Sequence, residues 1–153
     1  MTTHKSRIRF AQSAPEVYKA MVQLDAAARK GLDPELTELV KIRASQINHC
    51  AFCIDMHSKD ARAAGESEKR IYLLNAWEDA GDIYTAKERA ALALTEAVTV
   101  LTDGFVPDEV YDHAAAHFED QELAQLIALI LTINAWNRIG VTTRLAPGAY
   151  KPQ

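Results

Sequence analysis

Two cysteines and a histidine form the pattern in this sequence that is best suited to chemistry. Cys50, Cys53 and His57 stand three and four residues apart in the segment Cys-Ala-Phe-Cys-Ile-Asp-Met-His. If this segment is helical, the three positions fall within roughly 60° of one another around the helix axis. One face of the helix then presents two thiols and an imidazole.

Thiols in the first turn of a helix have an environment that favours reactivity. The unpaired amides of that turn carry partial positive charge, which stabilises a thiolate and lowers the pKa of the thiol. A thiolate attacks peroxides and disulfides, and a second thiol three residues away can convert a sulfenic acid into a disulfide. His57, one turn beyond Cys53, is placed to hold or remove its proton. The pattern therefore predicts a redox-active thiol pair.

Glu38 is the carboxylate whose position adds to this pattern. It lies twelve residues before Cys50 on the preceding predicted helix, and a chain reversal at Asn48 and His49 would bring it to the thiols. A carboxylate there would serve as a proton acceptor in a relay. Without that spacing, Glu38 reads as an ordinary exposed helix carboxylate.

The elements that position these residues are all predicted to be helices. Capping boxes at Ser13-Ala-Pro-Glu16 and Thr85-Ala-Lys-Glu88 open two of them. The first predicted helix runs from Ser13 to Gly31 with Val17, Met21, Leu24 and Ala28 on one apolar face, and the next two run from Asp33 to just before Cys50 and from Cys50 to Gly65. A fourth begins at Ser67 and contains Ile71, Leu74 and Trp77. The last three run from Thr85 to Gly104 with Leu101 inside, from Pro107 to about Phe118, and from Asp120 to about Gly140.

No segment shows strand alternation, and no repeat or linker divides the chain. The sequence has 153 residues of which 48% are hydrophobic, which suits one domain with a proper core. We expect a single all-α domain over residues 1–153, a bundle of about six to seven helices. The last helix is apolar on nearly every face, which indicates a central position or a subunit contact, so we expect a homo-oligomer.

Composition and charge exclude several classes of partner. The formal net charge is −4 and no basic stripe is present, so we expect no nucleic acid. Met1 to Phe10 lacks the apolar core of a signal peptide and no segment reads as a membrane span, so we expect no membrane partner and a cytoplasmic location. Two cysteines cannot form a stabilising disulfide framework, and in a reducing cytosol such a pair serves redox chemistry or metal binding.

The combined pattern resembles that of a known family. Glu38, eleven intervening residues, Cys50-X-X-Cys53, three more residues and His57 resemble the active site of the alkyl hydroperoxidase D branch of the carboxymuconolactone decarboxylase superfamily. The resemblance is close from Thr37 to Gly65 and looser up to Asn134-Ala-Trp-Asn137-Arg138, which is similar to that family's last core helix. It implies an AhpD-like helical bundle, trimers or hexamers, and a cofactor-independent peroxidase or disulfide-exchange activity.

The resemblance also implies roles for individual residues. By position, Cys53 is the peroxide-reactive thiol, Cys50 the resolving thiol, Glu38 the proton acceptor and His57 the group that helps to activate Cys53. We therefore expect an antioxidant oxidoreductase that reduces a hydroperoxide and is recycled by an external thiol or disulfide reductase, without cofactor or metal.

Four further positions leave open questions. Well-characterised members of the family resemble Cys-X-His-Cys, whereas this chain has Phe52 at the place of the inner histidine. His49 precedes the motif and is the alternative relay member. Asn137 and Arg138 either orient a substrate or satisfy polar groups between subunits.

Other interpretations compete with the peroxidase. A zinc site would need further ligands, and His4, His113 and His117 are distant in sequence, with the latter two better placed on a helix surface. The cysteines could also be inert core residues. A lactone decarboxylase, which would not need the thiol pair, and a non-catalytic redox-sensing module are the remaining alternatives.

Overall fold

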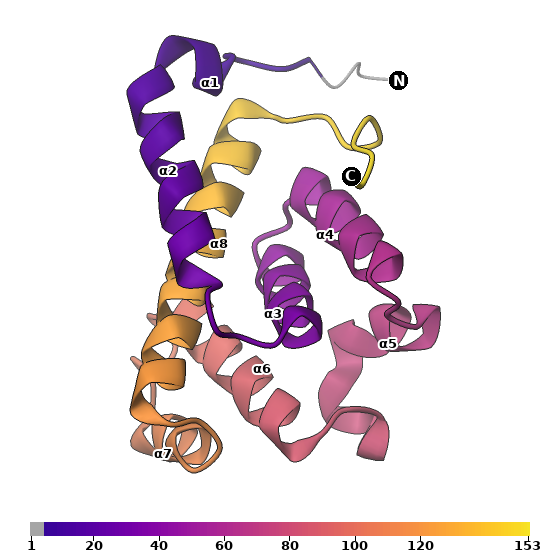
Figure 1. The fold of residues 1–153 in the computed structure, drawn as a ribbon, viewed down its shortest axis with the longest axis vertical. Coiled ribbons are helices and arrows are strands. Elements are labelled where there is room, and N and C mark those ends of the chain that lie inside the picture. The colour runs from indigo at the N-terminus through magenta and orange to yellow at the C-terminus, as the bar shows by residue number, and fades with distance from the viewer. Residues whose placement is uncertain (1–4) are drawn as a thin grey trace.

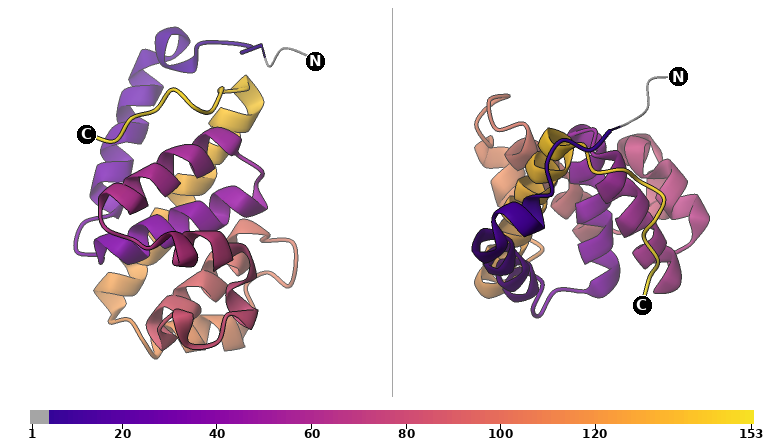
Figure 2. Two further views of the ribbon diagram at one scale, coloured as in Figure 1. Left: turned by 90° about the vertical axis from the view of Figure 1, so that its right-hand side faces the viewer. Right: turned by 90° about the horizontal axis from the view of Figure 1, so that it is seen from above.

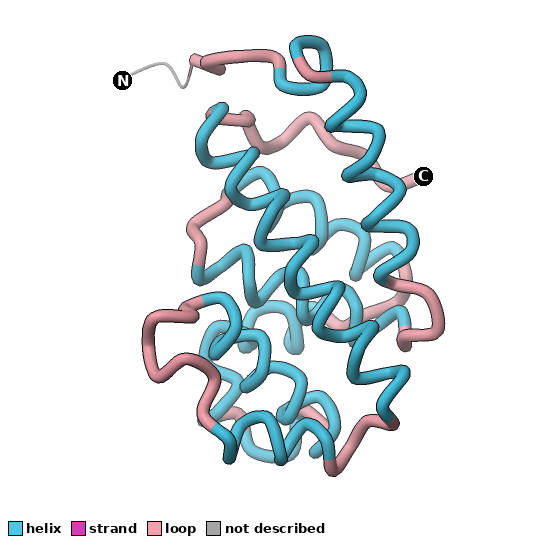
Figure 3. Tube along the Cα trace, turned by 90° about the vertical axis from the view of Figure 1, so that its left-hand side faces the viewer, coloured by secondary structure: helices cyan, strands magenta, loops and turns pink. Residues whose placement is uncertain are grey.

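The structure is a computed structural model that describes residues 5–153, so His4 lies outside the described residues. Over this range the chain is helical and contains no strand (Figures 1 and 3), which confirms the expected all-α class. The elements are α1 (Phe10–Ser13), α2 (Pro15–Ala28), α3 (Pro34–Ile47), α4 (Ala51–Ala63), α5 (Glu68–Leu73), the 3-10 helices η1 (Leu74–Asp79) and η2 (Gly81–Ile83), α6 (Ala86–Thr99), α7 (Asp108–Ala115) and α8 (Asp120–Thr143).

The longest helix, α8, runs through the centre of the molecule. It packs against α2, α3, α4, α6 and α7, and Leu126, Leu129 and Ile133 are completely buried along it. By length and composition alone α8 could cross a membrane, with a mean hydropathy of 1.2, which the sequence analysis did not expect. Its packing against five helices accounts for part of that apolar character, whereas Leu131 and Val141 lie exposed on its outer face.

The helix that carries Glu38 is buried between two hydrophobic clusters. Leu36 and Val40 of α3 pack into a cluster with α6, α7 and α8, while Leu39 and Ile42 pack into a second cluster with η1 and α6. Figure 2 shows α4 lying beside α3, and these two helices are in extensive contact. The pair α3 and α4 therefore forms a rigid platform for the predicted site.

Local sequence signals place most helix starts. The Asp33 carboxylate accepts from the backbone N–H of Leu36 at 2.9 Å, and Ser67 caps α5 in the same way. The predicted capping box of Thr85 and Glu88 is present in both directions. These starts are confirmed, as is the start of α4 at the cysteine motif.

The predicted capping box at Ser13 is wrong. Ser13 is the last residue of α1, where its backbone N–H donates to the carbonyl of Arg9 at 3.0 Å, and Ala14 precedes α2 without a side-chain cap. The segment closes its own short turn, which accounts for one more helix than expected. The predicted apolar face of α2 is also largely unburied, because Val17 and Leu24 are 53% and 48% exposed.

Other boundaries shift by a few residues. The helix α6 ends at Thr99 and not at Gly104, because Val100 leaves helical geometry with φ −102° and ψ 58°, which exposes Leu101. The helix α7 stops at Ala115, before Phe118, although the latter is buried as a core residue. Glu119 and not Asp120 stands at the N-cap of α8, and α8 continues past Gly140 to Thr143.

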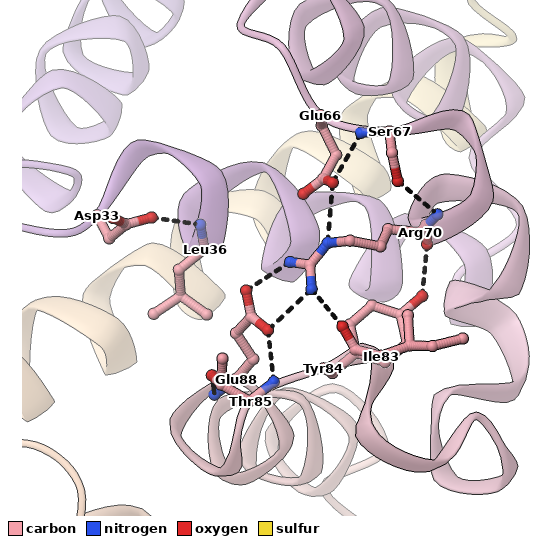
Figure 4. Close-up of polar contacts among 9 residues, drawn as sticks. All are labelled: Asp33, Leu36, Glu66, Ser67, Arg70, Ile83, Tyr84, Thr85 and Glu88. Atoms are coloured by element: carbon pink, nitrogen blue, oxygen red, sulfur yellow. Dashed lines mark hydrogen bonds and ion pairs between the residues drawn. The ribbon is translucent and has the colours of Figure 1, made fainter.

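A group of charged side chains joins α5 to α6 and η2 (Figure 4). We call it the Arg70 cluster: Glu66, Arg70, Ile83, Tyr84 and Glu88. The Arg70 guanidinium donates to Glu66 at 2.8 Å, to Glu88 at 2.5 Å and to the carbonyl of Ile83 at 2.6 Å. The two carboxylates raise the pKa of Arg70, and burial raises the pKa of Tyr84 to about 12.

Candidate active site

The turn between α3 and α4 sets the position of the first cysteine. After the C-cap Asn48, His49 has a φ of 55° and its N–H donates to the carbonyl of Gln46, while the N–H of Cys50 donates to the carbonyl of Ser45 at 3.0 Å. These two hydrogen bonds form a Schellman motif, in which the residue after the C-cap is left-handed. The exposed His49 is therefore a turn residue that ends α3.

Cys50 begins the next helix as well. Its Sγ accepts from the backbone N–H of Cys53 at 3.4 Å, so a thiol serves as the N-cap of α4. On the other side α8 approaches closely at Gly140, where an added Cβ would lie 2.9 Å from the Cys50 Sγ and 3.7 Å from the Cys53 Sγ. A glycine fits there because any side chain would displace the Cys50 sulfur. Both cysteines are free and buried.

Asparagine side chains of α8 form hydrogen bonds with the residues of this turn. Asn137 is completely buried, donates to the Ser45 hydroxyl at 2.9 Å and accepts from Asn48 at 2.9 Å. Asn48 also donates to Asn134 at 2.9 Å. The Asn137 side chain also lowers the pKa of both thiols, which makes it a supporting residue of the pair.

The two thiols have opposite electrostatic environments. The hydrogen bond from the Cys53 thiol, together with those from the amides of Cys53 and Phe52 and from Asn137, lowers the pKa of Cys50 to about 7, against the effect of burial. The same hydrogen bond, burial and the negative charge of Cys50 raise the pKa of Cys53 well above its usual range. The lower thiol pKa that we expected at the helix start therefore holds for Cys50 only, because Cys53 carries the proton that the pair shares.

The predicted carboxylate and histidine meet directly. His57 is buried, and its Nδ1 lies 2.9 Å from the Oε2 of Glu38. Because a carboxylate oxygen can only accept, this contact assigns the hydrogen to Nδ1 and leaves the Nε2 lone pair free to accept a proton. Glu38 thus contacts His57 and not a thiol, and its immediate effect is to orient the imidazole.

A cavity of about 740 Å³ gives these groups access to a substrate. Cys53, His57 and Glu38 all line it, whereas Cys50 does not. The remaining lining residues come from the segment before α1 and from α1, α2, α3, α4, α8 and the C-terminal tail, and the apolar ones include Ile8, Phe10, Tyr18, Val22, Phe52, Met56, Trp136, Ile139 and Leu145. The cavity therefore presents Cys53 as the accessible thiol and Cys50 as the thiol behind it.

Arg138 lies apart from this cavity, as does His49. Arg138 is exposed and donates to the carbonyl and the side chain of Asn134, beside a small second pocket of about 260 Å³. Of the two residues predicted near the end of the last helix, the structure brings only Asn137 to the thiols.

Two residues of the site were missed by the sequence analysis. Asp60 lines the cavity on α4, and the hydroxyl of Tyr150 in the C-terminal tail donates to its Oδ1 at 2.6 Å. Asp60 stands three residues after His57, so the same helical spacing that linked the cysteines could have found it. No local signal marks Tyr150, because it reaches Asp60 only through the fold.

Glu38, His57 and Asp60 form the one group with metal-ligand potential in the described part of the chain. One ligand atom from each lies within 4.8 Å of the others, and neither cysteine belongs to the group. His57 hydrogen-bonds Glu38, and Tyr150 hydrogen-bonds Asp60, so none of these side chains lacks a partner. We therefore treat them as a hydrogen-bonded network. His113 and His117 contact each other on α7 and the residues after it, outside this group.

The chain resembles proteins of one family over most of its length. It is 42% identical to the uncharacterised protein YdfG of Bacillus subtilis over 136 residues, which are 88% of this chain and 92% of that protein. Alkyl hydroperoxide reductase AhpD of Bradyrhizobium diazoefficiens is 39% identical over 62 residues, which are 39% of this chain and 34% of that protein.

A solved structure has the same fold throughout. ATU0492 of Agrobacterium tumefaciens, a protein of unknown function described as a candidate antioxidant defence protein AhpD, superposes with a TM-score of 0.91 at 39% identity, covering 95% of this chain and all 100% of that one. The model of the carboxymuconolactone decarboxylase family matches residues 15–97. The chain belongs to the carboxymuconolactone decarboxylase family, in its AhpD-like branch.

Proposed function

We propose that this protein is a thiol-dependent peroxidase that reduces organic hydroperoxides. The observation that carries the proposal is the placement of Cys53 in the wall of a large, mostly apolar cavity, beside the hydrogen-bonded His57 and Glu38 and in front of Cys50. Family membership supports a peroxidase-related chemistry, and the apolar wall suits a hydroperoxide with an organic substituent.

The first step requires a base, because Cys53 holds its proton in the resting pair. Nε2 of His57 takes the proton from the Cys53 Sγ while Glu38 stabilises the imidazolium. The Sγ then attacks the terminal oxygen of the hydroperoxide and the O–O bond breaks. His57 returns the proton to the leaving alkoxide, so one thiol and one hydroperoxide become one sulfenic acid and one alcohol.

The second step uses the other thiol. Cys50, whose pKa is about 7, attacks the sulfur of the Cys53 sulfenic acid as a thiolate and releases hydroxide, which is protonated to water. The product is a Cys50–Cys53 disulfide. An external thiol or disulfide reductase then supplies two electrons and two protons and restores both thiols. This cycle uses no metal or organic cofactor.

We further propose that the protein acts in the cytoplasm as a homotrimer or homohexamer. Exposed apolar side chains on α2 and α8, among them Val17 and Leu131, support self-association, because a contact between copies would remove them from water. Light scattering on the reduced and oxidised protein would measure the assembly and would detect a redox-sensing module, whose size would change with the disulfide.

The test is thiol counting by mass spectrometry after a stoichiometric pulse of an organic hydroperoxide. In the parent, both thiols should disappear together into one internal disulfide. In the Cys50→Ser variant, Cys53 should stop at a sulfenic acid, and the Cys53→Ser variant should lose turnover completely. Full activity in Cys53→Ser, or thiols that do not respond to peroxide, would contradict the proposal and favour a lactone decarboxylase or a non-catalytic module.

A further inference from the structure

The C-terminal tail is fastened to the helix that carries the thiols. After α8 the chain turns back past α4 (Figure 1), where Lys59, in the second half of that helix, donates to the carbonyl of Tyr150 at 3.1 Å. The N–H of Gly148 donates to the Asp55 carboxylate at 3.0 Å, and Gly148 has a φ of 103°, a conformation that favours glycine. These contacts hold Tyr150 at one place against α4.

At that place Tyr150 enters the network around His57. Its phenol donates to Asp60 at 2.6 Å and lines the same cavity as Cys53. The hydrogen bond to Asp60 and the negative charges of Asp60 and Glu38 raise the pKa of Tyr150 to about 12, so the phenol keeps its proton at neutral pH. Tyr150 is therefore a fixed donor to Asp60.

The position of Asp60 explains why it needs that donor. Its carboxylate, the Glu38 carboxylate and a ring nitrogen of His57 lie within 4.8 Å of one another. Two unshielded carboxylates next to one imidazole would favour the imidazolium. An imidazolium cannot take the proton of Cys53, which is what the proposed first step demands. The Tyr150 hydroxyl satisfies Asp60 and leaves Glu38 as the single partner of His57.

Other titratable groups line the same cavity as His57. They are Arg9 from the segment before α1, Asp25 and Arg29 from α2, Lys41 from α3 and Cys53 in the first turn of α4. Lys41 is buried and donates to Asp25 at 3.2 Å, so these two charges offset each other. The residues that α8 contributes to the cavity, Trp136 and Ile139, are uncharged. The hydrogen bond from Tyr150 to Asp60 can therefore be removed while the hydrogen bond between Glu38 and His57 stays in place.

We propose that Tyr150 and Asp60 are positioning residues of the thiol site, through which the C-terminal tail keeps Glu38 as the single hydrogen-bond partner of His57 and leaves the imidazole ready to accept the proton of Cys53. This inference rests on the proposed function, because it gives His57 the role of base for Cys53. It extends the site from α3 and α4 to a segment that lies ninety residues away from Asp60 in sequence.

The test is the rate of Cys53 alkylation by iodoacetamide as a function of pH, with the modified cysteine identified by fragment-ion mass spectrometry. In Tyr150→Phe the acid limb of this profile should move to higher pH by about one unit, equivalent to about a tenfold slower reaction at a fixed acidic pH. Asp60→Asn, which removes the charge, should move the limb to lower pH. The double variant should react like Asp60→Asn, because Tyr150 acts only through Asp60.

Tyr72→Phe is the matched control, since it removes the same kind of hydrogen bond, from Tyr72 to Glu68 at 2.9 Å, on the exposed surface. Its profile should coincide with that of the parent. An unshifted profile in both Tyr150→Phe and Asp60→Asn, or a shift in the same direction in both, would overturn the proposal. Alkylation needs no peroxide, so a protein without peroxidase activity would refute the proposed function while this comparison still decides the role of Tyr150.

Discussion

The Arg70 cluster and the thiol site both bring charged side chains together between helix ends, yet their hydrogen bonds are completed differently. In the Arg70 cluster one guanidinium donates to two carboxylates and a carbonyl, and the Tyr84 hydroxyl donates to the carbonyl of Arg70 itself (Figure 4). Within the described residues, the Oε2 of Glu66 is the one buried side-chain nitrogen or oxygen without a hydrogen-bond partner. Because that oxygen is buried and the other polar groups of the cluster bond one another, the cluster offers no accessible group to a substrate.

In the thiol site, by contrast, reactive groups remain available to a substrate. Nε2 of His57 is free to accept a proton, the pKa of Cys50 is lowered to about 7, and Cys53 lines a cavity of about 740 Å³. The difference suggests that the first region stabilises the fold and the second carries reactivity. Substitutions in the two regions should therefore separate the loss of stability from the loss of activity.

Glu38→Gln should give the largest effect. The amide keeps the size of the side chain but stabilises an imidazolium poorly, so kcat/KM for a hydroperoxide should fall about 100-fold, within the range for loss of acid–base catalysis. The melting temperature should stay close to that of the parent, because Glu38 is a partly exposed residue with one hydrogen bond. If Glu38→Gln lowered stability together with activity, the thiol site would not differ in role from the Arg70 cluster.

Arg70→Met should lower the stability of the protein and leave its activity unchanged. It leaves Glu66 and Glu88 without their cation, which should lower the free energy of unfolding by about 2 to 3 kcal/mol, the scale of hydrogen bonds to charged groups. Activity per folded molecule should not change. Arg62→Met is the control, because its ion pair with Glu68 is exposed and should contribute less than about 1 kcal/mol. Chemical denaturation measures both variants, and equal losses would show that the Arg70 cluster adds nothing special.

The thiol pair should titrate near neutrality. Because the pKa of Cys50 is lowered to about 7, the thiolate is present above that pH and is lost as the pH falls through it. The ultraviolet absorbance of thiolate should show this midpoint in the parent. In Cys50→Ser the midpoint should move up, since burial still disfavours the charge on Cys53. A midpoint that is the same in both proteins would mean that the hydrogen bond between the thiols has no influence.

His49→Gly should have the smallest effect. Glycine adopts the left-handed conformation of His49 easily, so fold and peroxide reduction should both stay within about twofold of the parent. His49→Val should destabilise the turn, because a β-branched residue at positive φ is strained. A large loss of activity in the glycine variant with an intact fold would restore His49 as a relay member.

Local signals in the sequence predicted more of this molecule than long-range ones did. The caps at Asp33 and Thr85 and the thiol at the start of α4 depend on residues three or four positions apart, and the structure has all of them. The spacing of Glu38 brought it to the helix that carries the motif, because one short turn separates two helices of known pitch, but its side chain contacts His57 and not the thiols that we expected it to meet. The capping box predicted at Ser13 is wrong because the preceding residues close a turn of their own, which no capping residue in the sequence marks.

The rest of the site depends on distant parts of the chain. Gly140 and Asn137 meet the thiols across about ninety residues, and Tyr150 reaches Asp60 over a similar distance. Such encounters follow from how α8 and the tail pack, which periodicity alone does not determine. The exposed face of α2 shows the same limit, because an apolar stripe predicts burial without saying against which surface.

Cys50 is shared by two helices, and this ties the state of its sulfur to the dynamics of the backbone. Its N–H closes the end of α3, while its Sγ accepts the amide of Cys53 at the first turn of α4. Oxidation of this sulfur would weaken the second contact and leave the first in place. Amide hydrogen exchange at the start of α4 should thus accelerate on oxidation while the end of α3 stays protected, so that fraying of one helix turn reports the redox state of the pair.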